Sequence, residues 1–158
     1  MSAVVPALSA ALVARWQVLP ALQAITVQGA SPIVGLGVPV GGLGDPGAWL
    51  RVEFDGSPDA RENARWSREW LDLACTRQRE VGELVCTAAA QTGDDDVPAM
   101  EVVAHQLVDA CVADLKSDLT VGGIVWSQYV ASGSAQQLKT TAGVAVIVPF
   151  TVAYAAPV

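Results

Sequence analysis

The C-terminal segment, residues 142–158, carries no charged side chain and is apolar at nearly every position. A strand spanning Val144 to Tyr154 would therefore present apolar side chains on both of its faces. Its β-branched residues, together with Gly143 and Pro149, favour such a strand over a membrane-spanning helix. Both faces must then be covered, either by helices or by a neighbouring subunit. Because Pro149 has no N–H to donate, we expect a bulge or an edge position there, and an apolar edge would need cover from another copy.

Two segments have the spacing of amphipathic helices. In residues 4–18, Leu8, Leu12 and Trp16 recur at helical intervals, and Pro20 marks the end. Residues 96–119 form the second, with acidic residues and Pro98 at its start. The stripe expected to be buried on this second helix consists of Met100, Val103, Leu107, Cys111 and Leu115.

The remaining apolar runs predict strands. We expect short strands at 25–28 and 123–130, and a strand at 48–54 with Leu50, Val52 and Phe54 on one side. Residues 65–73 fit either a helix or a strand, and a strand is preferred because 78–91 makes a plausible antiparallel partner. In that partner the side chains expected to face the same way are Leu84, Cys86, Ala88 and Ala90.

Taken together, these elements predict one α+β domain over residues 1–158, a mostly antiparallel mixed sheet packed with two helices. The Gly/Pro-rich segment 29–47 should be mostly loop, with a short extended piece at 33–36. A loop this long inside a compact domain is often functional.

The composition favours association with other proteins. Hydrophobic residues make up 52% of the chain and charged residues only 16%, so apolar surface is either buried efficiently or covered by partners. An Ala/Val-rich composition without functional meaning explains the same numbers. The net charge of -7 disfavours binding to a phosphate backbone, although an acidic surface can line a passage through which DNA slides.

The residue types that catalysis or metal binding needs are scarce. The single histidine, His105, lies between Glu101 and Asp109 on a face expected to be exposed; the spacing permits a metal site, but nothing else supports one. The three cysteines are widely spaced, which favours buried thiols over a zinc site or a disulfide framework. Since no phosphate-binding glycine motif occurs either, we expect no catalytic residues, no metal and no cofactor.

Trp66 and Trp70 stand out because they are interleaved with Arg61, Arg65 and Arg68. Mixed aromatic and arginine residues are typical of the centres of protein interfaces. The alternative is a sheet face covered by arginine stems.

The order of several short motifs over residues 48–155 resembles the tail terminator proteins of actinobacterial siphophages, themselves similar to lambda-type tail terminators and tail-to-head joining proteins. The motifs are a V-x-F-D-G strand end at Asp55-Gly56, the run Gln91–Asp94 before a long helix, the Gln136-Gln137 turn and a closing strand at Ala145–Val152. The interface residues that we take from this resemblance and from the composition are Asp55, Arg61, Arg65, Trp66, Arg68, Trp70, Gln136, Gln137 and Pro149.

The resemblance implies a structural virion protein that assembles in the host cytoplasm. It would form a ring, usually a hexamer, that caps the tail tube, ends tail polymerisation and receives the head–neck connector. Its partners would be itself, the tail tube protein and a head–tail stopper or connector, with DNA passing through without specific binding and no membrane involved. The alternatives are a head–tail adaptor or stopper, a capsid decoration protein, or a small-molecule enzyme or binding domain with the Gly/Pro segment as a lid.

Overall fold

The computed structural model describes residues 2, 4–39, 46–57, 63–140 and 143–158, without the side chains of residues 138–140. It confirms the α+β class, with three helices and a seven-stranded mixed sheet. The helices are α1 (Val5–Gln17), α2 (Pro20–Gln23) and α3 (Val97–Ser117). The strands are β1 (Ile33–Leu36), β2 (Gly47–Val52), β3 (Ala64–Trp70), β4 (Gln78–Thr92), β5 (Ser127–Gly133), β6 (Gln136–Thr140) and β7 (Gly143–Pro157).

Two long antiparallel strands, β4 and β7, form the centre of the sheet and pair from one end to the other. β3 and β2 follow one another along the free side of β4, β3 beside residues 78–84 and β2 beside residues 86–91. β5 and β6 do the same along the free side of β7. Of the strands in the described part of the chain, only β1, which lies outside β2, is paired in parallel. The sheet is therefore about twice as long as its outer strands, because each edge is built from two short strands in succession.

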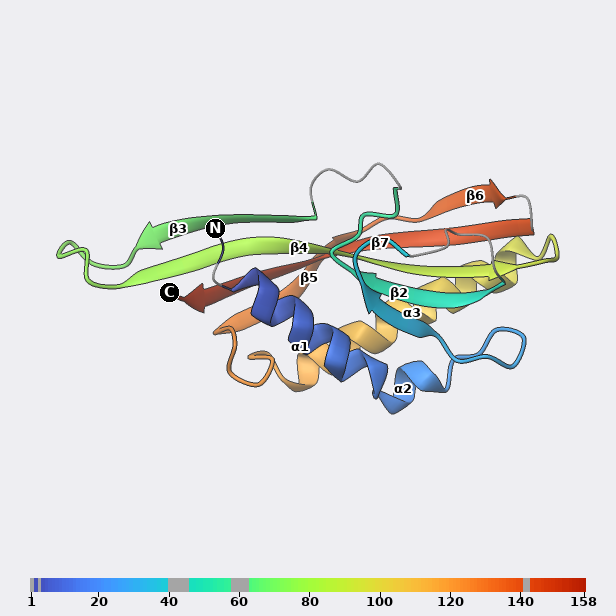
Figure 1. Cartoon of the computed structure of the whole chain (residues 1–158), viewed down its shortest axis with the longest axis horizontal. Helices are drawn as coiled ribbons and strands as arrows, with labels where there is room; N and C mark the ends of the chain where they lie inside the picture. Colours follow the sequence, from blue (N-terminus) through green and yellow to red (C-terminus); the bar gives the residue numbers. More distant parts are fainter. Residues whose placement is uncertain (1, 3, 40–45, 58–62, 141–142) are drawn as a thin grey trace.

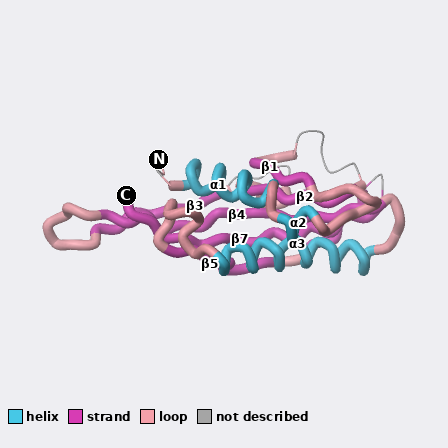
Figure 2. The backbone as a smooth tube through the Cα atoms, turned by 90° about the horizontal axis from the view of Figure 1, so that it is seen from below, coloured by secondary structure: helices cyan, strands magenta, loops and turns pink. Residues whose placement is uncertain are grey.

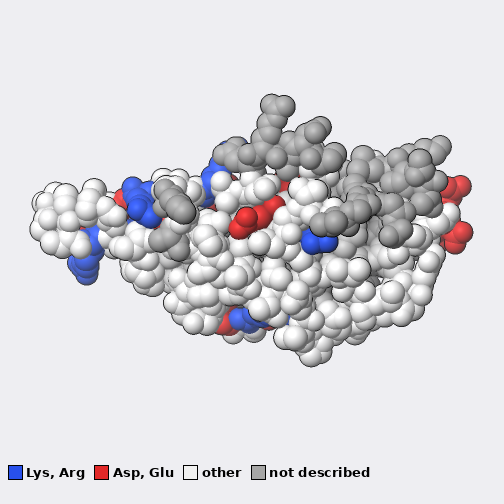
Figure 3. Space-filling view, viewed as in Figure 1, with Lys and Arg blue, Asp and Glu red and all other residues white. Residues whose placement is uncertain are grey.

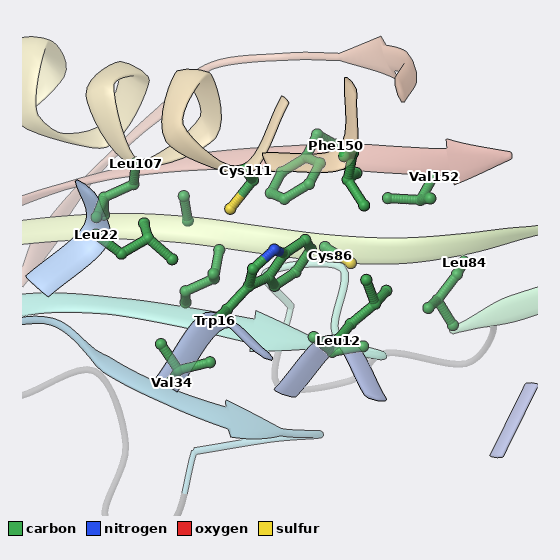
Figure 4. Close-up of a cluster of buried hydrophobic side chains, with 14 of the residues drawn as sticks. Leu12, Trp16, Leu22, Val34, Leu84, Cys86, Leu107, Cys111, Phe150 and Val152 are labelled. Atoms are coloured by element: carbon green, nitrogen blue, oxygen red, sulfur yellow. The ribbon is translucent and has the colours of Figure 1, made fainter. Parts of the chain in front are cut away.

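The helices lie along one side of the sheet, which we call the helix face (Figures 1 and 2). α1 packs against β1 and β2, whereas α3 packs against β4, β7 and β5. Trp16 of α1 is fully buried between these layers, with its ring 6.4 Å from that of Phe150 on β7 (Figure 4). Its indole N–H donates to Asp114 of α3 at 3.1 Å, so a single side chain connects both long helices to the sheet.

The opposite face of β7 is covered partly by the chain that follows β2. Ile147 on this face is fully buried, and a Cβ on Gly56 would lie 3.0 Å from its Cγ2 atom. The prediction that both faces of the last strand are buried is confirmed over this part of β7. One cover consists of helices, as expected, but the other is the segment after β2 of the same chain, where helices or a neighbouring subunit were expected.

We predicted that Phe54 lies on the same side of the strand as Leu50 and Val52, and this prediction is wrong. Glu53 has a left-handed φ of 59°, which interrupts the strand alternation. Phe54 is consequently buried on the opposite face, where its ring lies 5.9 Å from that of Trp49.

Two predicted strands also differ from the structure. Residues 25–28 contribute only an isolated bridge between Val27 and Ala30, because Gln28 and Gly29 form a turn with positive φ. The strand predicted at 123–130 begins later, at Ser127, after a turn in which both Gly122 and Gly123 have positive φ.

Pro149 is neither on a sheet edge nor at a bulge of its own strand, because β7 pairs continuously with β4 there. The carbonyl of Pro149 accepts the N–H of Ser134 at 3.0 Å. Since the N and O atoms of a strand residue point to the same side, the missing N–H of Pro149 faces the break between β5 and β6. The interruption lies in the neighbouring edge, and this is why proline is tolerated in a central strand.

Candidate functional site

The hairpin of β3 and β4 extends past the rest of the molecule at one end (Figure 1). We call residues 64–84 the arm. Four of the predicted interface residues, Arg65, Trp66, Arg68 and Trp70, lie on β3 and are exposed. The structure therefore brings these four together on one strand.

The other predicted interface residues lie elsewhere. Gln136 and Gln137 are exposed on β6, which pairs with residues 143–147 of β7, at the opposite end of the sheet from β3. Asp55 is half-buried and accepts the backbone N–H two residues later at 2.8 Å, as a turn-forming aspartate does. Pro149 is half-buried in the sheet, and Arg61 lies outside the described residues.

Alternation along β3 divides its side chains between the two faces. Trp66 pairs with Gly82, and Arg68 pairs with Glu80, so both lie on the helix face together with Trp70. Trp66 is 40% exposed and Trp70 is 55% exposed, because the helices end before they reach this part of β3. At the tip, Leu73 is fully exposed. The arm thus presents large apolar side chains that the described structure leaves partly or, at Leu73, fully exposed.

The arginines of the arm are largely held by carboxylates. Arg79 pairs with Glu69 at 2.6 Å, and Arg77 pairs with Asp72 at 3.4 Å. The guanidinium of Arg68 lies 5.4 Å from the ring centroid of Trp66, close enough for a cation–π contact. These contacts limit the conformations of the exposed side chains, which lowers the entropy cost of burying them against a partner.

Glu80 is a buried carboxylate that was not predicted from the sequence. Its side chain is fully buried and accepts hydrogen bonds from the hydroxyl of Ser2, from Tyr154 at 3.0 Å and from Arg68 at 3.3 Å. The signal was present in the sequence, because the alternation of Leu84 and Cys86 continues backwards to position 80. The role of Glu80 is to join the arm to the N-terminal segment and to the last strand.

Two hollows flank the outer strands at this end. An open groove of about 510 Å³ crosses the face opposite the helices, with Val81, Ala153 and Tyr129 among its lining residues. A smaller recess of about 330 Å³ lies between the end of α3 and β5, lined by Val112, Leu115, Lys116, Leu119, Gln128, Tyr129 and Val130. Tyr129 is 64% exposed and lines both. The linings are mostly apolar, which suits contact with another protein surface better than the binding of a charged small molecule.

His105 and Cys111, which were considered for chemistry, differ in their exposure to solvent. His105 is exposed on α3, whereas Cys111 is buried, and burial raises the pKa of its thiol well above the ordinary value. Among the described residues, no three His, Cys, Asp or Glu side chains are placed to hold a metal ion. Within the same part of the chain, no helix has the length and apolar character needed to cross a membrane.

Comparison with known protein families gives no match, and comparison with characterised proteins gives none either.

Proposed function

We propose that this protein is a structural subunit that assembles with copies of itself into a ring, and that the ring terminates the tail of a siphophage. The observation that carries the assembly part is the projecting arm, whose tryptophans and tip leucine are exposed. Patches of this kind usually mark interaction sites. The order of motifs that resembles tail terminators supports the more specific role.

Two further features are consistent with a ring around DNA. The chain has a net charge of -7 but few charges in all, so copies can meet through uncharged surface while a lumen repels nucleic acid. The described surface in Figure 3 shows long uncharged areas between a few charged groups. The ring would cap the tube, stop its growth and receive the neck connector, with DNA passing through unbound.

A direct test adds the purified chain to growing tubes of the cognate tail tube protein, followed by electron microscopy. We expect rings with a central hole, located at tube ends, and tubes that stop growing. A chain that leaves tube growth unchanged and never appears at the ends would contradict tail termination. Rings that bind neck components but not tubes would instead indicate an adaptor or stopper.

A further inference from the structure

Two open strand edges flank the same part of the sheet. Among the described residues, β3 pairs only with β4 and β5 only with β7, and the stretches of β4 and β7 that they border are paired with each other. This end of the molecule is therefore a four-stranded antiparallel sheet in the order β3-β4-β7-β5. Both outer strands are seven residues long, so each offers a ladder of matching length to a further strand.

The β5 edge lacks the usual protection against pairing. Exposed edges in soluble proteins commonly carry charged residues or proline, but Ser127–Gly133 contains neither. Its one irregularity is a shift of register between Val130 and Ser132, near its end. The first part of β5 is thus a regular and uncharged edge that another strand can extend.

Strand direction selects a partner edge for β5. Directions alternate from β3 through β4 and β7 to β5. A second copy placed beside β5 in the same orientation consequently presents its β3 antiparallel to β5. Its helix face then lies on the same side as α3 of the first copy.

In that arrangement the exposed tryptophans of β3 lie on the same side of the extended sheet as the recess beside β5. Gln128 shows that the recess opens on the helix face, because its side-chain amide donates to the carbonyl of Leu115 at the end of α3 at 2.7 Å. Trp66 and Trp70 lie on the helix face of β3. The two aromatic side chains and the apolar recess are therefore on matching sides of the extended sheet.

The chemistry of the recess suits an indole ring. Leu119, at its rim, is 53% exposed and offers apolar contact. An indole ring is large and mostly apolar, so a tryptophan that enters the recess can bury its ring against the apolar side chains of the lining.

We propose that β3 of one copy adds to β5 of the next, head to tail, with Trp70 in the recess beneath the end of α3 and Trp66, about 13 Å further along the strand, packed beside the recess. This inference rests on the proposed self-assembly and names the surfaces that carry it. Because the two surfaces differ, the contact is heterologous, and such a contact forms a ring when the rotation from one copy to the next divides a full turn.

The charge of the arm and the surface area that it can bury both fit a second copy of the chain as the partner of β5. In the arm, four arginines balance four carboxylates, so the whole net charge of -7 lies outside it. Arm-to-body contact therefore avoids placing two acidic bodies directly together. Trp66 is 40% exposed and Trp70 55% exposed, so the two together have about 200 Å² left to bury. This is about a quarter of the roughly 800 Å² per partner of a standard interface, and strand pairing has to add the rest.

The test uses Trp70→Ala on the arm and Leu119→Asp at the recess, with Val102→Asp as the control. Val102 is 56% exposed at the other end of α3, so the control introduces the same charge at similar exposure away from the recess. Each mass is measured by sedimentation equilibrium at high protein concentration, with circular dichroism to verify folding. We expect both test variants to associate at least about thirtyfold more weakly than the native chain, as loss of an interface anchor does, and the control to keep the native mass.

Mixing the two test variants distinguishes the head-to-tail contact from two-fold pairing. The arm of the Leu119→Asp copy and the recess of the Trp70→Ala copy are both intact, so an equimolar mixture should form a 1:1 dimer that does not grow. If either variant alone keeps the native mass, or if the mixture stays monomeric, the head-to-tail pairing is wrong. A native chain that remains monomeric under these conditions also overturns it.

The β3–β5 contact and the proposed tail termination can each fail while the other stands. If native rings cap tubes and both test variants still form them, the β3–β5 contact fails while tail termination stands. If the β3–β5 contact holds but tubes grow unchanged, tail termination fails and the assembly remains.

Discussion

At the scale of single residues, the base of the arm depends on a buried carboxylate. Glu80 is fully buried, and a buried charge is costly unless donors satisfy it. Ser2, Arg68 and Tyr154 supply those donors from three different parts of the chain. This cluster holds the N-terminal segment, the arm and the last strand in one arrangement.

Replacing Tyr154 with phenylalanine should lower the free energy of unfolding by about 1–2 kcal/mol at neutral pH, because Glu80 loses a donor. Burial first, and then the hydrogen bond to Glu80, raise the pKa of Tyr154 to about 12. Because this pKa is higher in the folded chain than its ordinary value of 10.0, the protonated Tyr154 stabilises the folded state fully below pH 10. That stabilisation is lost as the pH rises towards 12. In urea unfolding, the difference between native and variant should therefore narrow above pH 10. A difference that stays constant or widens would contradict this role.

The three cysteines should differ sharply in reactivity. Cys86 and Cys111 are buried, and burial raises the pKa of both thiols, whereas Cys75 is exposed near the tip of the arm. Because the thiolate is the reactive form, an aromatic disulfide reagent should modify one thiol per native chain and three after denaturation. Cys75→Ser should remove the native reaction entirely. Rapid labelling that survives this substitution would show that a buried thiol is accessible.

At the scale of elements, the arm requires close approach between β3, β4 and the side chain of Tyr154. Gly82 lies opposite Trp66, and a Cβ at this position would meet the carbonyl oxygen of Arg65 at 2.5 Å and the hydroxyl of Tyr154 at 2.7 Å. One of these contacts is backbone and cannot move without separating the strands. The φ of Gly82 is not in the left-handed region, so backbone conformation does not require a glycine here. Glycine is needed because a Cβ atom would have no space.

Gly82→Ala should therefore destabilise the protein by about 1–3 kcal/mol, the usual cost of overpacking. Hydrogen exchange should show β3 losing protection before the centre of β7. Gly133→Ala on β5 is the matched control, because its Cβ would meet nothing closer than 3.6 Å. Equal effects of the two substitutions would indicate that the alanine, and not the close approach, is responsible.

At the scale of the whole molecule, charge is unevenly distributed. The arm is electrically neutral, whereas the rest of the chain carries the net charge of -7. Self-repulsion between acidic bodies opposes any association of copies, and dissolved salt screens it over a Debye length of about 10 Å at 0.1 M. Strand pairing and tryptophan burial, the contacts proposed here, are themselves uncharged.

Association of the native chain should consequently strengthen as ionic strength rises from about 0.01 M to about 0.15 M. Sedimentation at several salt concentrations measures this directly. An interface made of ion pairs would show the opposite trend, and weaker association at high salt would count against an uncharged contact.

The sequence by itself determined the elements whose signal is local. Periodic apolar residues such as Leu8, Leu12 and Trp16 define α1, and alternation correctly predicted β3 as the antiparallel partner of β4. The grouping of Trp66 and Trp70 with arginines on an exposed strand also follows from residues close together in the chain. These features were predictable because backbone preference and side-chain direction depend mainly on near neighbours.

Only the tertiary structure decided how distant segments meet. The left-handed Glu53 moved Phe54 to the other face, and the break between two edge strands made room for Pro149 in a central strand. The same long-range pairing separated Gln136 from the arm and joined Glu80 to Ser2. Such contacts depend on which strands share an edge of β4 or β7. That choice reflects the packing of the whole sheet under its helices, so no short stretch of sequence contains it.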